Sequence, residues 1–192
     1  MDENLQNALA VARVLDEQGV CWFLGGSLAS SLYGIPRATL DADLVADLRL
    51  AHVKPLLREL GQEWYLDEDA IREAIQQRRS FNLINFGSAM KVDIFVPKLR
   101  RFESGQFARA TRMAVAERGE ITVPVCSVED IVAAKLEWFR LGGEVSERQW
   151  GDIIGVLRNC SERLNRELLR ESAAELGIAD LLTKALVEAG AL

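Results

Sequence analysis

Residues 39–44 read Thr-Leu-Asp-Ala-Asp-Leu and lie in a segment where apolar and acidic side chains alternate. This alternation predicts a strand over residues 40–46, with Asp41 and Asp43 on one face, because residues two apart on a strand point the same way. Both carboxylates can then converge on one cation, and Mg²⁺ prefers hard oxygen ligands of this kind. Asp-x-Asp by itself is far more typical of a solvated strand face than of a metal site, so the surrounding sequence has to decide between the two interpretations.

Two further features strengthen the metal interpretation. Residues 24–27, Leu-Gly-Gly-Ser, end a short apolar strand and open a helix, where bare backbone and unpaired N–H groups can approach a phosphate. Asp93 lies in the otherwise apolar run 91–96, where an ionised side chain needs a charged partner. Nucleotidyl transfer requires these parts: a turn that holds phosphates, and carboxylates that hold two metals roughly 4 Å apart.

At these residues the sequence resembles the nucleotidyltransferase superfamily, with its DNA-polymerase-β-like fold, and within it the small bacterial AbiEii-toxin-type enzymes. The resemblance covers about residues 20–155: Gly26-Ser27, then thirteen residues, then Asp41-Ala-Asp43, and a later aspartate. Further matching positions are Gly25, Gly34, Arg37, residues 39–44, residues 92–94, residues 129–131 and Lys135.

The resemblance implies a fold, a cofactor and roles for particular residues. It implies a mixed sheet flanked by helices, two Mg²⁺ ions and an NTP as donor. Asp41, Asp43 and Asp93 would bind the metals, and Asp93 would also activate the acceptor hydroxyl. The implied nucleotide or phosphate contacts are Gly25, Gly26, Ser27, Arg37, Thr39 and Lys135, although loop solvation and strand packing explain Arg37 and Thr39 equally well.

The sequence allows two interpretations each for Lys135 and Asp152. Lys135 falls on an otherwise apolar helix face, so its ammonium either reaches out to water or points into a cleft towards phosphate, which the resemblance favours. Asp152 is either an accessory acid of the site or the partner of Arg148 one helical turn earlier.

Apolar periodicity predicts an α+β fold with a helical C-terminal appendage. We expect a catalytic domain over residues 1–126 and a helical subdomain over residues 127–192. Expected helices cover 3–18, 27–33, 50–60, 67–78, 127–141, 146–159, 161–176 and 178–188; expected strands cover 20–24, 40–46, 80–86, 90–96 and 121–125. The strands at 80–86 and 90–96 should form a hairpin, and Asp67 and Ser127 should cap helices.

Composition excludes several classes of protein. The net charge of −6 argues against a basic nucleic-acid coat, and the longest uncharged stretch is too rich in glycine and serine for a membrane span. With no secretory segment at the start, we expect a cytoplasmic protein. The three separated cysteines form no zinc motif and predict buried free thiols, and the single histidine, His52, excludes sites that need two imidazoles.

Residues 98–115 carry five basic side chains against one acidic side chain, Glu103. On an acidic molecule this segment is the best candidate for contact with a polyanion such as an RNA end. A solvated, mobile connector explains it equally well.

The leading hypothesis is a Mg²⁺-dependent enzyme that moves a nucleoside monophosphate from an NTP to a hydroxyl on RNA, protein or a small molecule. Such an enzyme would be a component of a toxin–antitoxin or abortive-infection system, with a cognate toxin or antitoxin protein as partner. The alternative is a catalytically inactive nucleotide-binding or toxin-neutralising module of the same fold. An aminoglycoside-type nucleotidyltransferase would share the chemistry of the leading hypothesis and differ only in its acceptor.

Overall fold

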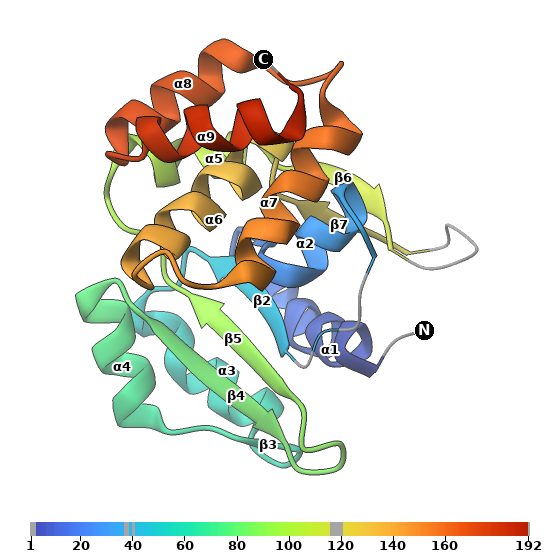
Figure 1. Cartoon of the computed structure of the whole chain (residues 1–192). Coiled ribbons are helices and arrows are strands. Elements are labelled where there is room, and N and C mark those ends of the chain that lie inside the picture. Colours follow the sequence, from blue (N-terminus) through green and yellow to red (C-terminus); the bar gives the residue numbers. More distant parts are fainter. Residues whose placement is uncertain (1–2, 37–38, 40, 116–120, 192) are drawn as a thin grey trace. The chain divides into compact units, whose positions relative to one another are not determined.

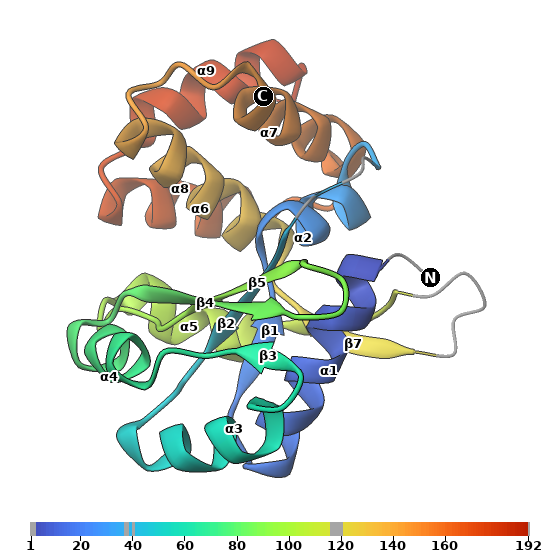
Figure 2. The same cartoon turned by 90° about the horizontal axis from the view of Figure 1, so that it is seen from below.

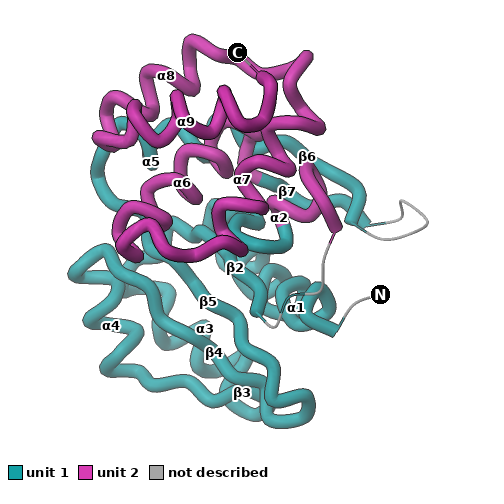
Figure 3. The backbone as a smooth tube through the Cα atoms, viewed as in Figure 1, with its two compact units in different colours: residues 1–28, 38–125 teal, residues 29–37, 126–192 magenta. Residues whose placement is uncertain are grey.

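The computed structural model describes residues 3–36, 39, 41–115 and 121–191. These residues form two compact units (Figure 3): the first comprises residues 1–28 and 38–125, and the second residues 29–37 and 126–192. Residues 29–37 thus belong with the C-terminal part of the chain, whereas the sequence placed them in the N-terminal domain. The division into domains at residue 126 stays a prediction.

The first unit is built on a mixed sheet (Figure 1). Its strands are β1 (Trp22–Leu24), β2 (Asp41–Ala46), β3 (Trp64–Tyr65), β4 (Ser80–Asn85), β5 (Lys91–Phe95), β6 (Thr111–Ala114) and β7 (Thr122–Val125). Across the described residues, the strand order is β3-β4-β5-β2-β1-β7-β6. The α+β fold class is therefore confirmed.

Helices flank this sheet. They are α1 (Glu3–Glu17), the first turn of α2 (Gly26–Tyr33), the short 3₁₀ helix η1 (Leu50–His52), α3 (Val53–Leu60), α4 (Glu68–Gln77) and α5 (Arg101–Arg109). Helix α1 contacts β2, β5 and α3, and α4 contacts β4; Figure 2 shows α1 and α3 on one side of the sheet. The predicted cap of α4 is confirmed, because the Asp67 carboxylate accepts a hydrogen bond from the Ala70 N–H at 3.0 Å.

Strand pairing places the aspartates in the middle of the sheet. Strands β4 and β5 form the predicted antiparallel hairpin, and β5 runs parallel to β2 with Asp93 opposite Asp43. Alternate side chains Ala42 and Leu44 of β2 are fully buried, as is Val92 of β5. The aspartates therefore share the opposite face of the sheet from this core.

Residues 98–115 differ from the mobile connector that the sequence allowed. They form α5 and β6, and β6 pairs antiparallel with β7. Buried Phe102 anchors α5, and Phe107 of α5 packs edge to face on Phe23 of β1, with ring centroids 5.1 Å apart. Arg101 and Arg109 thus lie on α5 and Arg112 on β6, both regular elements of the first unit.

The second unit is helical. It comprises the rest of α2 together with α6 (Val128–Leu141), α7 (Glu147–Cys160), α8 (Arg166–Glu175) and α9 (Ala179–Ala189). Ser127 caps α6 as predicted, accepting from the Asp130 N–H at 3.1 Å. Residues 29–37 join this unit through Tyr33, whose hydroxyl donates to the Cys126 carbonyl at 2.7 Å. Within the described part of the chain, none of the helices combines the length and apolarity that crossing a bilayer demands.

The cysteines are free, but only Cys126 and Cys160 are buried, so the expectation of buried thiols is wrong for exposed Cys21. Burial, and after it the nearby negative charge of Asp130, raises the pKa of the Cys126 thiol well above its ordinary value. We expect a disulfide reagent at pH 8 to modify one thiol rapidly in the native protein and all three in urea. Cys21→Ser should remove the rapid phase; rapid modification of two or more thiols in the native protein would contradict this account of burial.

Candidate active site

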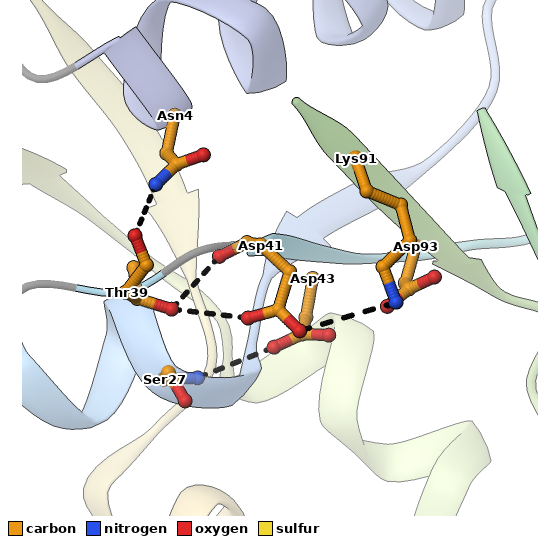
Figure 4. Close-up of polar contacts among 7 residues, drawn as sticks. All are labelled: Asn4, Ser27, Thr39, Asp41, Asp43, Lys91 and Asp93. Atoms are coloured by element: carbon orange, nitrogen blue, oxygen red, sulfur yellow. Dashed lines mark hydrogen bonds and ion pairs between the residues drawn. The ribbon is translucent and has the colours of Figure 1, made fainter. Parts of the chain in front are cut away.

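Three aspartates meet on one face of the paired strands β2 and β5 (Figure 4). Asp43 and Asp93 occupy opposite positions of the parallel ladder, and Asp41 lies two residues before Asp43 on the same face. The Asp93 side chain is only 17% exposed, compared with 40% for Asp41. The metal site expected from the sequence depends on this arrangement, in which carboxylates from two neighbouring strands lie together.

The charged partner that Asp93 needs is Lys91, two residues earlier on the same strand. Its Nζ lies 2.8 Å from Oδ2 of Asp93 and 4.0 Å from Oδ2 of Asp41. The hydrogen bond to Asp93, followed by the charges of Asp93, Asp41 and Asp43, outweighs burial and raises the pKa of Lys91. Sequence reasoning missed this residue, although the spacing that put Asp41 and Asp43 on one face puts Lys91 and Asp93 on one face as well.

The glycine turn approaches Asp43 directly. The backbone N–H of Ser27, at the start of α2, donates to Oδ2 of Asp43 at 3.3 Å. A Cβ on Gly26 would lie 1.7 Å from that same oxygen, and the φ of Gly26 is +55°. Glycine is therefore needed at residue 26 for both space and backbone conformation. The helix start that was expected to face phosphate faces the Asp43 carboxylate here.

Thr39 orients Asp41. Its hydroxyl lies 3.0 Å from Oδ1 and 3.0 Å from the backbone oxygen of Asp41, so its proton has two acceptors on that residue. The Thr39 carbonyl in turn accepts a hydrogen bond from Nδ2 of Asn4 on α1. Arg37, the neighbouring candidate, lies outside the described residues.

Lys135 and Asp152 form an ion pair inside the second unit. Lys135 Nζ on α6 lies 2.9 Å from Oδ2 of Asp152 on α7, and the two side chains are only 10% and 9% exposed. Lys135 therefore does not extend to water. The partner of Asp152 that the structure shows is therefore Lys135 on the neighbouring helix, where the simpler interpretation had Arg148 on its own helix.

Comparison with known proteins identifies the family. A family model described as "Nucleotidyl transferase AbiEii toxin, Type IV TA system" matches residues 8–179. The chain belongs to the AbiEii nucleotidyltransferase family. No curated protein sequence matches it significantly.

Solved structures share the fold of this AbiEii-family chain. An antigenic nucleotidyltransferase-like protein from Paracoccidioides brasiliensis is 18% identical with a TM-score of 0.54, covering 97% of this chain and 94% of its own. The antibiotic-resistance factor ANT(2'')-Ia is 16% identical with a TM-score of 0.57, and the match covers 92% of each chain. The lincosamide antibiotic adenylyltransferase LnuA is 16% identical with a TM-score of 0.51, covering 81% of this chain and 96% of its own.

The aspartates suit a divalent cation by their chemistry. Carboxylate oxygens are the ligands that Mg²⁺ prefers, and an ammonium already lies between Asp41 and Asp93. Among the described residues, no group of three or more His, Cys, Asp and Glu side chains is already arranged to hold a metal ion. The three carboxylates fit the metal by the chemistry of their oxygens, and the cation that lies beside them in this structure is the Lys91 ammonium.

The buried pair of Lys135 and Asp152 makes a prediction about stability. Removing one partner of a buried ion pair costs about 3–5 kcal/mol, whereas replacing both partners with apolar groups is close to neutral. We expect Lys135→Met to lower the free energy of unfolding in urea by that amount, and the added change Asp152→Leu to restore most of it. Arg72→Met, which breaks a more exposed ion pair with Glu68 on α4, is the control and should cost far less. Equal losses for Lys135→Met and Arg72→Met would contradict the prediction.

Proposed function

We propose that this AbiEii-family chain is a metal-dependent nucleotidyltransferase that moves a nucleoside monophosphate from an NTP to a hydroxyl. One observation carries the proposal. Asp43 and Asp93 lie in register on the paired strands β2 and β5, and the Lys91 ammonium lies between Asp93 and Asp41. Membership of a nucleotidyltransferase family supports the same chemistry. In this proposal Asp41, Asp43 and Asp93 hold the divalent metals, which when bound would neutralise charge on the triphosphate.

The chain's own residues have separate tasks in the transfer. Gly26 and the Ser27 N–H fix the position of Asp43, and the Thr39 hydroxyl fixes the carboxylate of Asp41. The acceptor oxygen forms a bond to the α-phosphorus, the bond between that phosphorus and the β-bridging oxygen breaks, and pyrophosphate leaves. We assign the proton of the acceptor hydroxyl to the carboxylate of Asp93. Gly25, Arg37 and Lys135 stay proposed contacts of the nucleotide phosphates, and Asp152 stays a proposed accessory acid.

The acceptor and the biological partner belong to the proposal as well. The family description names a toxin of a type IV toxin–antitoxin system, so we propose a cognate antitoxin as partner. The residues of 98–115 remain a candidate contact for an RNA acceptor, although some of their guanidinium groups are engaged within the fold. Arg100 pairs with Glu103, and Arg112 donates to the Thr122 carbonyl at 2.7 Å.

Label transfer tests the proposal. The protein is incubated with each of the four α-³²P-labelled NTPs, Mg²⁺ and a total cell extract, and the label is followed into RNA, protein and small molecules. We expect one acceptor fraction to take up label with release of pyrophosphate, and EDTA to abolish the transfer until Mg²⁺ is restored in excess. Two classes of antibiotic, added separately, test small-molecule acceptors: lincosamides, which the name of one fold neighbour suggests, and aminoglycosides, which the third hypothesis from the sequence names. Calorimetry that shows binding of Mg²⁺-NTP without release of pyrophosphate on any acceptor would favour the inactive binding module instead.

A further inference from the structure

We propose that Lys91 is a built-in competitor of the metal: its side chain holds the divalent-ion position and thereby sets the affinity of the site for the ion. The inference rests on the proposed function, because it takes Asp41, Asp43 and Asp93 as the metal ligands. It assigns to Lys91 a positioning role, since the residue acts through these carboxylates.

Two features of the strand geometry place Lys91 beside the carboxylates. Its Cα pairs with that of Asp41 across β2 and β5, and it lies two residues before Asp93 on the same face of β5. Its Nζ contacts Asp93 Oδ2 at 2.8 Å and lies 4.0 Å from Asp41 Oδ2. The ammonium thus sits between carboxylates from both strands, where a bound cation would share their oxygens.

Their positive charges prevent the Lys91 ammonium and a divalent ion from occupying this position together. A divalent ion held by all three carboxylates would stand next to the ammonium, and like charges at such distances repel each other strongly. Lys91 can leave, because its side chain is 40% exposed and a lysine carries its charge on a flexible four-carbon stem. Metal binding therefore has to break the contact between Lys91 and Asp93.

The exchange has two consequences for the protein. Without metal, Lys91 compensates carboxylates that would otherwise repel one another on the sheet. With metal alone, the ion must displace Lys91 without help. A metal that arrives with a nucleotide brings additional phosphate ligands, so the competition favours binding of metal and nucleotide together over binding of metal alone.

Mn²⁺ binding in the absence of nucleotide tests the inference. Free Mn²⁺ is measured by electron paramagnetic resonance during titration of the wild-type protein, Lys91→Met, Lys91→Arg and Lys54→Met. We expect Lys91→Met to bind Mn²⁺ about tenfold more tightly than the wild type, because the competing charge is gone. Lys91→Arg keeps the charge and should stay near the wild type. Lys54→Met removes an exposed lysine from α3 and should bind Mn²⁺ like the wild type.

A second measurement locates the gained affinity and controls for folding. Adding Asp93→Asn to Lys91→Met should return Mn²⁺ affinity to the wild-type level or below it. The melting temperature of Lys91→Met should rise more on addition of Mn²⁺ than that of the wild type, which a purely structural role of Lys91 does not predict. Unchanged or weaker Mn²⁺ binding by Lys91→Met would overturn the inference, as would a gain that survives Asp93→Asn.

The outcomes also separate this inference from the proposed function. Tighter Mn²⁺ binding by Lys91→Met, together with a wild-type protein that transfers no label to any acceptor, would uphold the inference and reject the enzyme. Label transfer that depends on Asp41 and Asp43, together with Mn²⁺ binding that is the same in the wild type and Lys91→Met, would support the enzyme and reject the inference about Lys91.

Discussion

Asp43→Asn and Asp41→Asn, made separately, are each expected to reduce label transfer from α-³²P-NTP by about 10³-fold or more, because phosphoryl-type chemistry depends on electrostatic positioning by these ligands. Asparagine keeps the size of the side chain and leaves an oxygen that can still accept the Ser27 N–H, but it removes the negative charge. Both variants should therefore fold, with circular dichroism spectra and melting temperatures close to those of the wild type. Initial rates of label transfer at saturating Mg²⁺ give the comparison.

Asp47→Asn is the matched control for this experiment. Asp47 directly follows β2, its side chain is 39% exposed, and its ion pairs are with Arg49 and Arg78. The substitution removes one carboxylate close in sequence to the site whose ion pairs are with Arg49 and Arg78, so transfer should continue at the wild-type rate. Full transfer by both Asp41→Asn and Asp43→Asn would remove the catalytic assignment.

Gly26→Ala is expected to have the second-largest effect, on stability and activity together. The added Cβ would lie 1.7 Å from Asp43 Oδ2 and 2.6 Å from Asp43 Cβ, so rotation of the carboxylate does not relieve the clash. The backbone must move, and an alanine at φ +55° is strained in addition. We expect a loss of about 1–3 kcal/mol in the free energy of unfolding and about a 100-fold fall in transfer, because displacement of a catalytic group by about 1 Å has an effect of that size.

Gly25→Ala provides the control for Gly26→Ala. A Cβ on Gly25 would meet only Val45 Cγ2 at 3.8 Å and the Asp43 carbonyl at 3.9 Å, which are ordinary contacts. Urea unfolding should place the stability of Gly25→Ala close to that of the wild type. Equal losses of stability in Gly25→Ala and Gly26→Ala would contradict the prediction that the clash with Asp43 destabilises Gly26→Ala.

Local patterns in the sequence were sufficient for much of the fold. Alternation identified β2, and two β-rich runs joined by a short glycine-containing turn identified the hairpin of β4 and β5. The caps at Asp67 and Ser127 follow from contacts within four residues along the chain. Strand β3 was missed because its two residues are too few to show a period. Helix α5 was missed because the arginines of its sequence resemble a solvated segment, while its packing through Phe102 and Phe107 is tertiary.

Local spacing likewise predicts one part of the candidate site and not the other. Residues that share a strand or a turn, such as Asp41 with Asp43, could be grouped from spacing alone. The parallel pairing that sets Asp93 opposite Asp43 joins residues fifty positions apart, and no local pattern states its register. Lys91 was overlooked for a different reason. Its spacing to Asp93 is visible in the sequence, but a site predicted to bind a metal ion is expected to contain acidic side chains and not a lysine.

The central claim is that Asp41, Asp43 and Asp93 together form a binding site for a divalent ion that takes part in nucleotidyl transfer. Anomalous diffraction from crystals grown with Mn²⁺ and an NTP tests it most directly, because the metal's own scattering locates the ion. We expect an anomalous peak within ligand distance of carboxylate oxygens from both β2 and β5, with the Lys91 ammonium moved away from Asp93. A difference map that shows no peak at these carboxylates while nucleotide is bound, with Lys91 still on Asp93, would contradict it.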